Sequence, residues 1–196
     1  MRLLAFTDFH VDGASLEAIR RKSKDADLLV CCGDMTVFGH GLEEAVHFLD
    51  QIGKKTLIIH GNHEDENKLE AACKKSKNLV FIHRVLKTID DFTFLGFGGE
   101  GFAKTAPGFE VWSSVISKGL RPEKTVLIVH QPPYGTKTDY LAWAGHVGNK
   151  SFKYFIDKFQ PKLTLCGHLH ETFNVKDKVK DSVVLNPGPD GTFVEI

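Results

Sequence analysis

The chain has 196 residues, with 25 Lys and Arg against 25 Asp and Glu, 42% hydrophobic residues, 18 Gly and 7 Pro. This is the composition of a globular protein long enough to bury a core without a disulfide or metal, so we expect a single domain over residues 1–196. The formal net charge of zero excludes a general nucleic-acid-binding signature, because no excess of cations exists to release counterions from a polyanion.

The apolar runs of the sequence are short. The run at 126–129 is typical, whereas a membrane span needs about 20 residues, so we expect no span. Asp8 interrupts the first apolar stretch too early for a signal peptide, which favours a cytoplasmic protein. The four cysteines lack the C-x-x-C spacing of a zinc site and are interpreted as buried, reduced thiols.

Strands and helices are predicted to alternate along the chain. Apolar runs without polar alternation predict buried strands at 3–6, 28–32, 56–59, 126–129 and 163–166. Apolar residues at i, i+3, i+4 and i+7 predict helices at 42–49 and 152–159. We further predict a hairpin at 84–89 and 92–96, and a closing antiparallel set at 172–176, 182–185 and 192–195. The pattern indicates an α/β fold with mixed sheets.

Polar side chains of metal-ligand or proton-transfer types follow the five buried runs, where parallel α/β folds bind ligands. They are Asp8, His10, Asp34, Asn62, His63, Glu64, His130, His168 and His170. In extended backbone, residues i and i+2 point to the same side about 6.6 Å apart, so Asp8 is expected to pair with His10, and His168 with His170. Carboxylate, amide and imidazole ligands without thiolates suit Mn(II), Fe or Zn. The glycines before Asp34, Asn62 and His168 permit tight turns and close backbone approach to a ligand.

The ordered series D-x-H, G-D, G-N-H-E, H and G-H-x-H closely resembles the calcineurin-like metallophosphoesterase superfamily along nearly the whole chain. The resemblance implies a four-layer α-β-β-α sandwich with two mixed β-sheets and a dinuclear metal centre at the strand ends. It implies that Asp8, His10 and His170 bind the first metal, that Asn62, His130 and His168 bind the second, and that Asp34 bridges them.

The resemblance also implies a mechanism. Two divalent ions, with Mn(II) favoured and Fe, Zn, Ni or Co as alternatives, would hold a bridging hydroxide that attacks phosphorus. His63, outside the metal shell, would protonate the leaving alkoxide or stabilise charge on the phosphoryl group. Glu64 could orient His63.

The sequence lacks residues that are typical of one subfamily, the phosphoprotein phosphatases, and this bears on the substrate class. Phosphoprotein phosphatases of the superfamily read G-D-x-x-D-R-G and R-G-N-H-E, and their arginines clamp a dianionic monoester. This chain has Val37, Phe38 and His60 at those positions, and its segment 130–136 resembles small prokaryotic phosphoesterases, many of which act on diesters. We therefore predict a phosphodiesterase for a small phosphoester, with a nucleotide-derived one as an option. A phosphomonoesterase and a noncatalytic metal-binding scaffold for protein partners are the alternatives; no motif indicates an oligomeric state.

A second candidate site lies at 145–150, just before a predicted helix. Here His146, Lys150 and backbone N–H groups could bind a phosphate, and ordinary helix entry is the alternative.

Several other residues near the motifs have two interpretations each. Phe9, Phe38, Phe97 and Phe102 either pack in the core or line a substrate pocket. The glycine-rich segment 96–101 is either a mobile rim or a set of turns. The remaining histidines are interpreted as exposed or as core residues with satisfied hydrogen bonds: His40, His47, His60 and His83.

Overall fold

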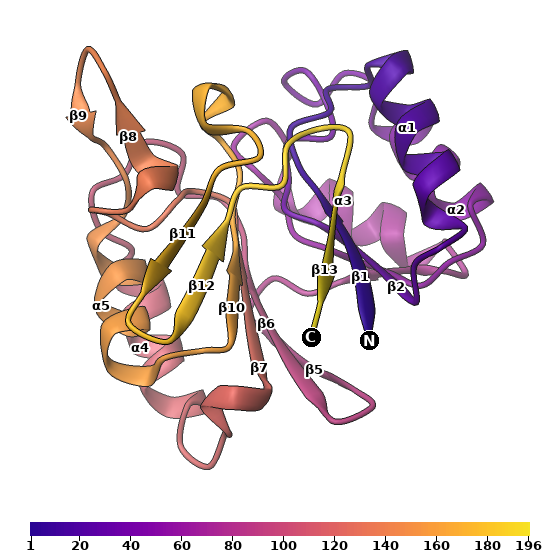
Figure 1. The fold of residues 1–196 in the computed structure, drawn as a ribbon. Coiled ribbons are helices and arrows are strands. Elements are labelled where there is room, and N and C mark those ends of the chain that lie inside the picture. The colour runs from indigo at the N-terminus through magenta and orange to yellow at the C-terminus, as the bar shows by residue number, and fades with distance from the viewer.

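The computed structural model describes residues 1–196 as two β-sheets packed face to face, with helices on both outer faces (Figure 1). The first sheet has the order β13-β1-β2-β3-β4. Its strands are β1 (Arg2–Phe6), β2 (Leu28–Cys31), β3 (Thr56–Ile58), β4 (Leu79–Phe81) and β13 (Thr192–Glu195). Strands β1 to β4 are parallel, and β13 runs antiparallel to β1.

The second sheet has the order β11-β12-β10-β7-β6-β5. Its strands are β5 (Val85–Ile89), β6 (Phe92–Phe97), β7 (Thr125–Val129), β10 (Leu163–Leu165), β11 (Lys176–Val179) and β12 (Ser182–Leu185). The four inner strands are parallel and the two edge strands are antiparallel to their neighbours. A small hairpin of β8 (Tyr140–Leu141) and β9 (Gly145–His146) projects beyond this sheet (Figure 1).

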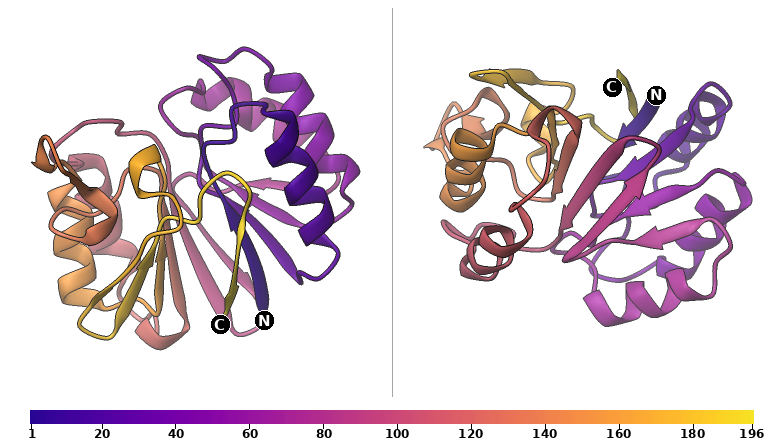
Figure 2. Two further views of the ribbon diagram at one scale, coloured as in Figure 1. Left: turned by 45° about the horizontal axis from the view of Figure 1, so that its top comes forward. Right: turned by 90° about the horizontal axis from the view of Figure 1, so that it is seen from below.

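The helices complete the four predicted layers. The first sheet is covered by α1 (Gly13–Ser23), α2 (Leu42–Gln51) and α3 (Glu66–Lys74), and the second by α4 (Pro107–Ile116) and α5 (Lys150–Phe159) (Figure 2). Short 3-10 turns lie at Pro122–Lys124, Lys137–Asp139 and His170–Thr172. None of these helices has the length and apolar character that crossing a membrane requires.

Alternation along the buried strands explains why the layers hold together. In β1, Leu4 and Phe6 face the helices, whereas Leu3 and Ala5 face the second sheet. Both faces of the strand are therefore apolar, which removes the polar alternation from its sequence. The five predicted buried strands are confirmed to within one residue at each end.

The predicted closing set of three strands is wrong in two respects. Residues 172–176 are mostly turn and 3-10 helix, and the strand begins only at Lys176. In addition, β11 and β12 pair in the second sheet, whereas β13 crosses to the first and pairs with β1. Local alternation identifies a strand and carries no information about a partner at the opposite end of the chain.

Candidate metal centre

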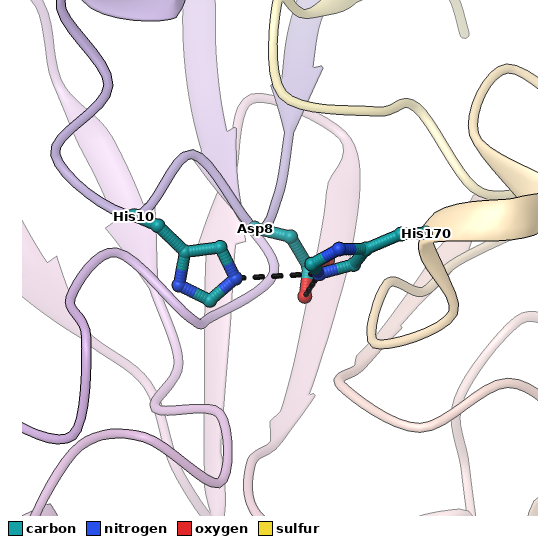
Figure 3. Close-up of side chains that lie close together, drawn as sticks. All are labelled: Asp8, His10 and His170. Carbon is teal, nitrogen blue, oxygen red and sulfur yellow. Dashed lines mark hydrogen bonds and ion pairs between the residues drawn. The ribbon is translucent and has the colours of Figure 1, made fainter.

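The loops after the parallel strands bring three side chains together as a first donor group. Asp8 and His10 follow β1, and His170 follows β10. Figure 3 shows the three side chains converging, with His10 Nε2 3.3 Å from His170 Nε2. His170 Nε2 lies 3.6 Å from Asp8 Oδ1, and the donor atoms of all three fall within 4.8 Å of one another. This is the set that the resemblance implies for the first metal.

A second donor group lies next to the first. The donor atoms of Asp34, His130 and His168 also fall within 4.8 Å of one another. His130 Nε2 is 3.3 Å from Asp34 Oδ2 and 3.1 Å from Asn62 Oδ1. The two groups are tied together, because the backbone N–H of His168 donates to Asp8 Oδ2 at 2.8 Å.

Backbone carbonyls orient two of the imidazoles. The Nδ1 atom of His10 lies 2.6 Å from the carbonyl of Thr36, and that of His130 lies 2.8 Å from the carbonyl of Cys32. Since a carbonyl only accepts, Nδ1 is the donor in each ring, and in the neutral ring the lone pair is on Nε2. A metal-binding histidine is held by an outer partner in the same way.

Two buried atoms that could bind a metal have no hydrogen-bond partner in the protein. Asp8 uses Oδ2 for the Thr7 hydroxyl and the His168 amide, while its Oδ1 makes no hydrogen bond. His168 Nε2 is also buried without a partner. Buried polar atoms without a hydrogen bond are rare in folded proteins. Carboxylate and imidazole groups together suit a divalent cation, so these two atoms indicate a metal site.

The protonation states of the second group follow from burial and from close charges. Burial acts to raise the pKa of Asp34, but the hydrogen bond and charge of His130 outweigh it and lower that pKa to about 2. Burial acts to lower the pKa of His130, but Asp34 raises it to about 9. Burial, with the charge of His130, lowers the pKa of His168 to about 4. A divalent cation bound here would take the place of the proton on His130.

The ligand loops have an unusual backbone. Asp8, His10, Asp34 and His168 all have positive φ, at 51°, 43°, 51° and 71°. Non-glycine residues rarely adopt this conformation, which tends to occur at functional sites. The extended backbone expected for Asp8 with His10 and for His168 with His170 is therefore wrong, although Asp8 and His10 do meet in one donor group. The chain turns at these residues, and His168 and His170 belong to different donor groups.

The motif glycines lie where two ligand loops pack closely against each other. A Cβ at Gly61 would collide with Asp34 Oδ1, and one at Gly167 would collide with Thr7 Oγ1. The absence of a side chain at these glycines therefore lets the ligand loops pack against each other. In the segment 96–101, the N–H of Gly98 donates to His83 Nδ1 and that of Gly99 to the His60 carbonyl, which favours ordered turns.

Glu64 holds two of the ligand loops together. Its carboxylate accepts hydrogen bonds from the N–H groups of Asp34, Thr36 and Gly61, each at 2.9 Å, and from the Thr36 hydroxyl at 2.6 Å. It makes no hydrogen bond to His63, so the expectation that Glu64 orients His63 is wrong.

Glu64→Gln is expected to lower the free energy of unfolding by about 2 kcal/mol or more, because an amide cannot accept all four buried donors. Chemical denaturation measures the change. Glu70→Gln on the exposed face of α3, where only a surface pair with Lys74 is lost, should stay within about 0.5 kcal/mol of the wild type. Equal stability of the two variants would contradict this role of Glu64.

His63 lies beside the second donor group. Its Nε2 is 3.8 Å from Asp34 Oδ2, and its Nδ1 accepts the backbone N–H of Phe38 at 3.1 Å. The Phe38 ring stacks on the imidazole with 4.2 Å between centroids. With Nδ1 accepting, the neutral ring carries its proton on Nε2, facing the metal centre.

The two interpretations of the flanking phenylalanines both occur. Phe9 and Phe97 are buried in the core, whereas Phe38 and Phe102 are 75% and 72% exposed. The exposed rings contact His63 and His168, respectively. They form apolar edges of the metal centre.

Among the remaining histidines, His40 and His47 are exposed and His60 and His83 are buried. The expectation of satisfied core histidines is incomplete. His60 Nδ1 and His83 Nε2 make no hydrogen bond, although His83 Nε2 lies 3.7 Å from Glu66 Oε2. The centroids of the two rings are 4.6 Å apart.

The candidate phosphate site at 145–150 does not offer the backbone N–H groups of the helix entry that the sequence predicts for it. Its backbone N–H groups are already used: Lys150 N donates to Lys104 O, and the next two amides donate to the Asn149 side chain. Only side chains remain for a ligand. His146 Nδ1 bonds Asp139 Oδ1 at 2.7 Å. Asp139 was missed in the sequence, although the T-x-x-D spacing from Thr136 is a recognisable cap signal.

Size alone does not locate the site. A hollow of about 600 Å³ between α4 and α5 is lined by Ser113, Tyr154 and Phe159, among others. It contains no residue of either donor group. A hollow of about 460 Å³ is lined by Phe38, His63 and Asn62, and it borders the second donor group because Asn62 Oδ1 lies 3.1 Å from His130 Nε2.

Comparisons with known proteins agree with this geometry. The sequence profile described as calcineurin-like phosphoesterase matches residues 1–172. An uncharacterized protein of Methanocaldococcus jannaschii is 30% identical, over 99% of this chain and 91% of its own length.

Solved structures share the fold. The crystal structure of TT1561 of Thermus thermophilus aligns with a TM-score of 0.76 at 14% identity, covering 95% of this chain and 88% of that one. A novel archaeal phosphodiesterase aligns with a TM-score of 0.53 at 18% identity, covering 96% and 84%. The profile match over most of the chain shows that this protein belongs to the calcineurin-like phosphoesterase family.

Proposed function

We propose that this protein is a dinuclear, Mn(II)-dependent phosphodiesterase for small phosphoesters. The observation that carries the proposal is the pair of donor groups at the strand ends, with Asp8 Oδ1 and His168 Nε2 buried and unpartnered. Asp34 is suited to bridge two cations. Two divalent ions bound there would supply positive charge and an activated water for attack at phosphorus.

His63 is proposed as the proton donor to the leaving alkoxide. The Phe38 N–H bonds Nδ1, so the proton on Nε2 faces the reacting group. Because its donor atom is 3.8 Å from Asp34 Oδ2, His63 reaches the edge of the second donor group. An acid in this position protonates the alkoxide as its bond to phosphorus breaks.

Two observations favour a diester over a monoester. His60, where a phosphoprotein phosphatase has arginine, is buried, and Val37 and Phe38 present apolar side chains to solvent. No arginine clamp for a dianion therefore occupies these positions. In addition, one hollow lies beside His63 and a second begins at Phe102, against His168, which gives room for two ester groups.

The protein is expected to hydrolyse bis(p-nitrophenyl) phosphate with higher kcat/KM than p-nitrophenyl phosphate, and a phosphoserine peptide should be among the poorest substrates. The measurement is made on one Mn(II)-loaded preparation at one pH. A monoester preference of tenfold or more, about 1.4 kcal/mol in the transition state, would reject the diesterase assignment in favour of a phosphomonoesterase. Metal binding without turnover of any ester would instead indicate a scaffold.

A further inference from the structure

A second polar hollow adjoins the metal centre beside His168. We call it the lysine pocket and define it by Phe102, Lys104, Tyr134, His146 and Lys150. Its volume of about 440 Å³ is in the range of small-molecule sites. The projecting β8–β9 hairpin, seen in Figure 1, contributes His146 to its wall.

The pocket adjoins the metal centre through the segment that follows β6. The Phe102 ring packs edge to face against His168, with 4.3 Å between centroids. One residue earlier, a Cβ on Gly101 would lie 3.4 Å from Asn62 Cβ. A group bound in the lysine pocket is therefore next to any phosphorus held at the donor groups.

The two lysines of the pocket form no ion pair. Lys104 and Lys150 are both exposed, neither has a salt-bridge partner, and no carboxylate lines the hollow. Their side chains branch from adjoining backbone, because Lys150 N donates to Lys104 O at 2.9 Å. Lys150 Nζ lies 5.2 Å from the centroid of the Tyr134 ring. Two neighbouring ammonium groups in a concave site favour an anionic ligand.

His146 is positioned from behind by a buried carboxylate. Asp139 is fully buried and accepts the N–H groups of Gly135, Thr136 and Gly148, as well as His146 Nδ1. Since the carboxylate accepts a hydrogen bond from the N–H at Nδ1, the ring orientation is set. Nε2 makes no hydrogen bond to the protein and remains for a ligand. An outer carboxylate that orients a histidine in this way is typical of binding sites.

We propose that the lysine pocket binds a second phosphate carried by the substrate, so that preferred substrates are phosphodiesters of alcohols that bear a further phosphate. The inference rests on the function proposed for the metal centre and names its substrate class. Lys104 and Lys150 bind the phosphate oxygens, and His146 in its doubly protonated form donates to the same group from Nε2. The rings of Tyr134 and Phe102 contact the organic part between the two phosphates.

Binding of nucleotide probes tests the pocket without any turnover. Thymidine 3′,5′-bisphosphate and thymidine 5′-phosphate are titrated into the Mn(II)-loaded protein by calorimetry. The bisphosphate should bind at least about tenfold more tightly, as expected for added charge-assisted hydrogen bonds. In the double variant Lys104→Ala/Lys150→Ala this ratio should fall to near one. Lys118→Ala, an exposed lysine after α4, should keep the wild-type ratio.

Kinetics separates this inference from the proposed function. The p-nitrophenyl ester of thymidine 5′-phosphate is compared with the same ester carrying a 3′-phosphate. The double variant should lose about tenfold more kcat/KM on the 3′-phosphorylated ester, through KM, and His146→Ala should lose less in the same direction. If the wild type cleaves neither ester, the diesterase proposal fails, and the binding ratio still decides the pocket. A ratio near one in the wild type, or unchanged in the double variant, overturns the inference.

Discussion

Asp34→Asn is expected to lower kcat/KM by about 10³-fold or more, which is about 4 kcal/mol of transition-state stabilisation. The carboxylate contacts His130 through Oδ2 and accepts the His63 amide through Oδ1. An amide can replace the second contact, but it has no charge with which to hold two cations close together. Steady-state rates are measured with saturating Mn(II), and metal content is measured on the same samples.

Asp12→Asn is the matched control for this variant. Asp12 caps α1 by accepting the Ser15 amide, and asparagine serves equally well as an N-cap. Its rates and stability should match those of the wild type. The wild type stripped with a chelator should lose activity and regain it when Mn(II) is added. Full turnover by the stripped protein would contradict the dinuclear mechanism.

The layered fold could be predicted because its signals are local. Buried strands such as β2 and β7 are continuous apolar runs, and α5 repeats apolar residues at helical spacing. Strand β4 was not predicted, although its three residues make it as long as β3 and β10. The pairing of β13 with β1 could not be predicted, because it depends on packing between the two ends of the chain.

The ligand set could be predicted for a different reason. Parallel strands present their carboxyl ends at one edge, so an ordered series of ligand residues at those ends predicts a common site. The backbone that aims the side chains could not be predicted, because positive φ at Asp8 and His168 depends on neighbouring loops. The role of Glu64 was missed because the partner of its Oε1 lies 28 residues away. Asp139 was missed although Thr136 and His146, its partners, are both near it in the sequence.

His63→Ala is expected to lower kcat by about 10²- to 10⁴-fold, the usual contribution of a positioned acid, while metal content stays at the wild-type level. His63 does not belong to either donor group, and its side-chain Nε2 lies 3.8 Å from Asp34 Oδ2. Metal analysis beside rate measurements checks both parts. The control is His47→Ala on α2, which should match the wild type. His47 is exposed, and its side chain forms a hydrogen bond with Gln51. Loss of metal from His63→Ala would make His63 a ligand.

The leaving group distinguishes an acid from a residue that only binds the phosphate. Alcohols of low pKa leave without protonation, so the defect of His63→Ala should be smallest for p-nitrophenyl esters and should grow as the leaving alcohol's pKa rises. The measurement is kcat for a series of aryl and alkyl diesters under conditions where bond cleavage limits the rate. Because the Phe38 N–H holds Nδ1, the neutral ring presents its single proton from Nε2. An equal defect across the series would assign His63 to charge stabilisation at the phosphoryl oxygens instead.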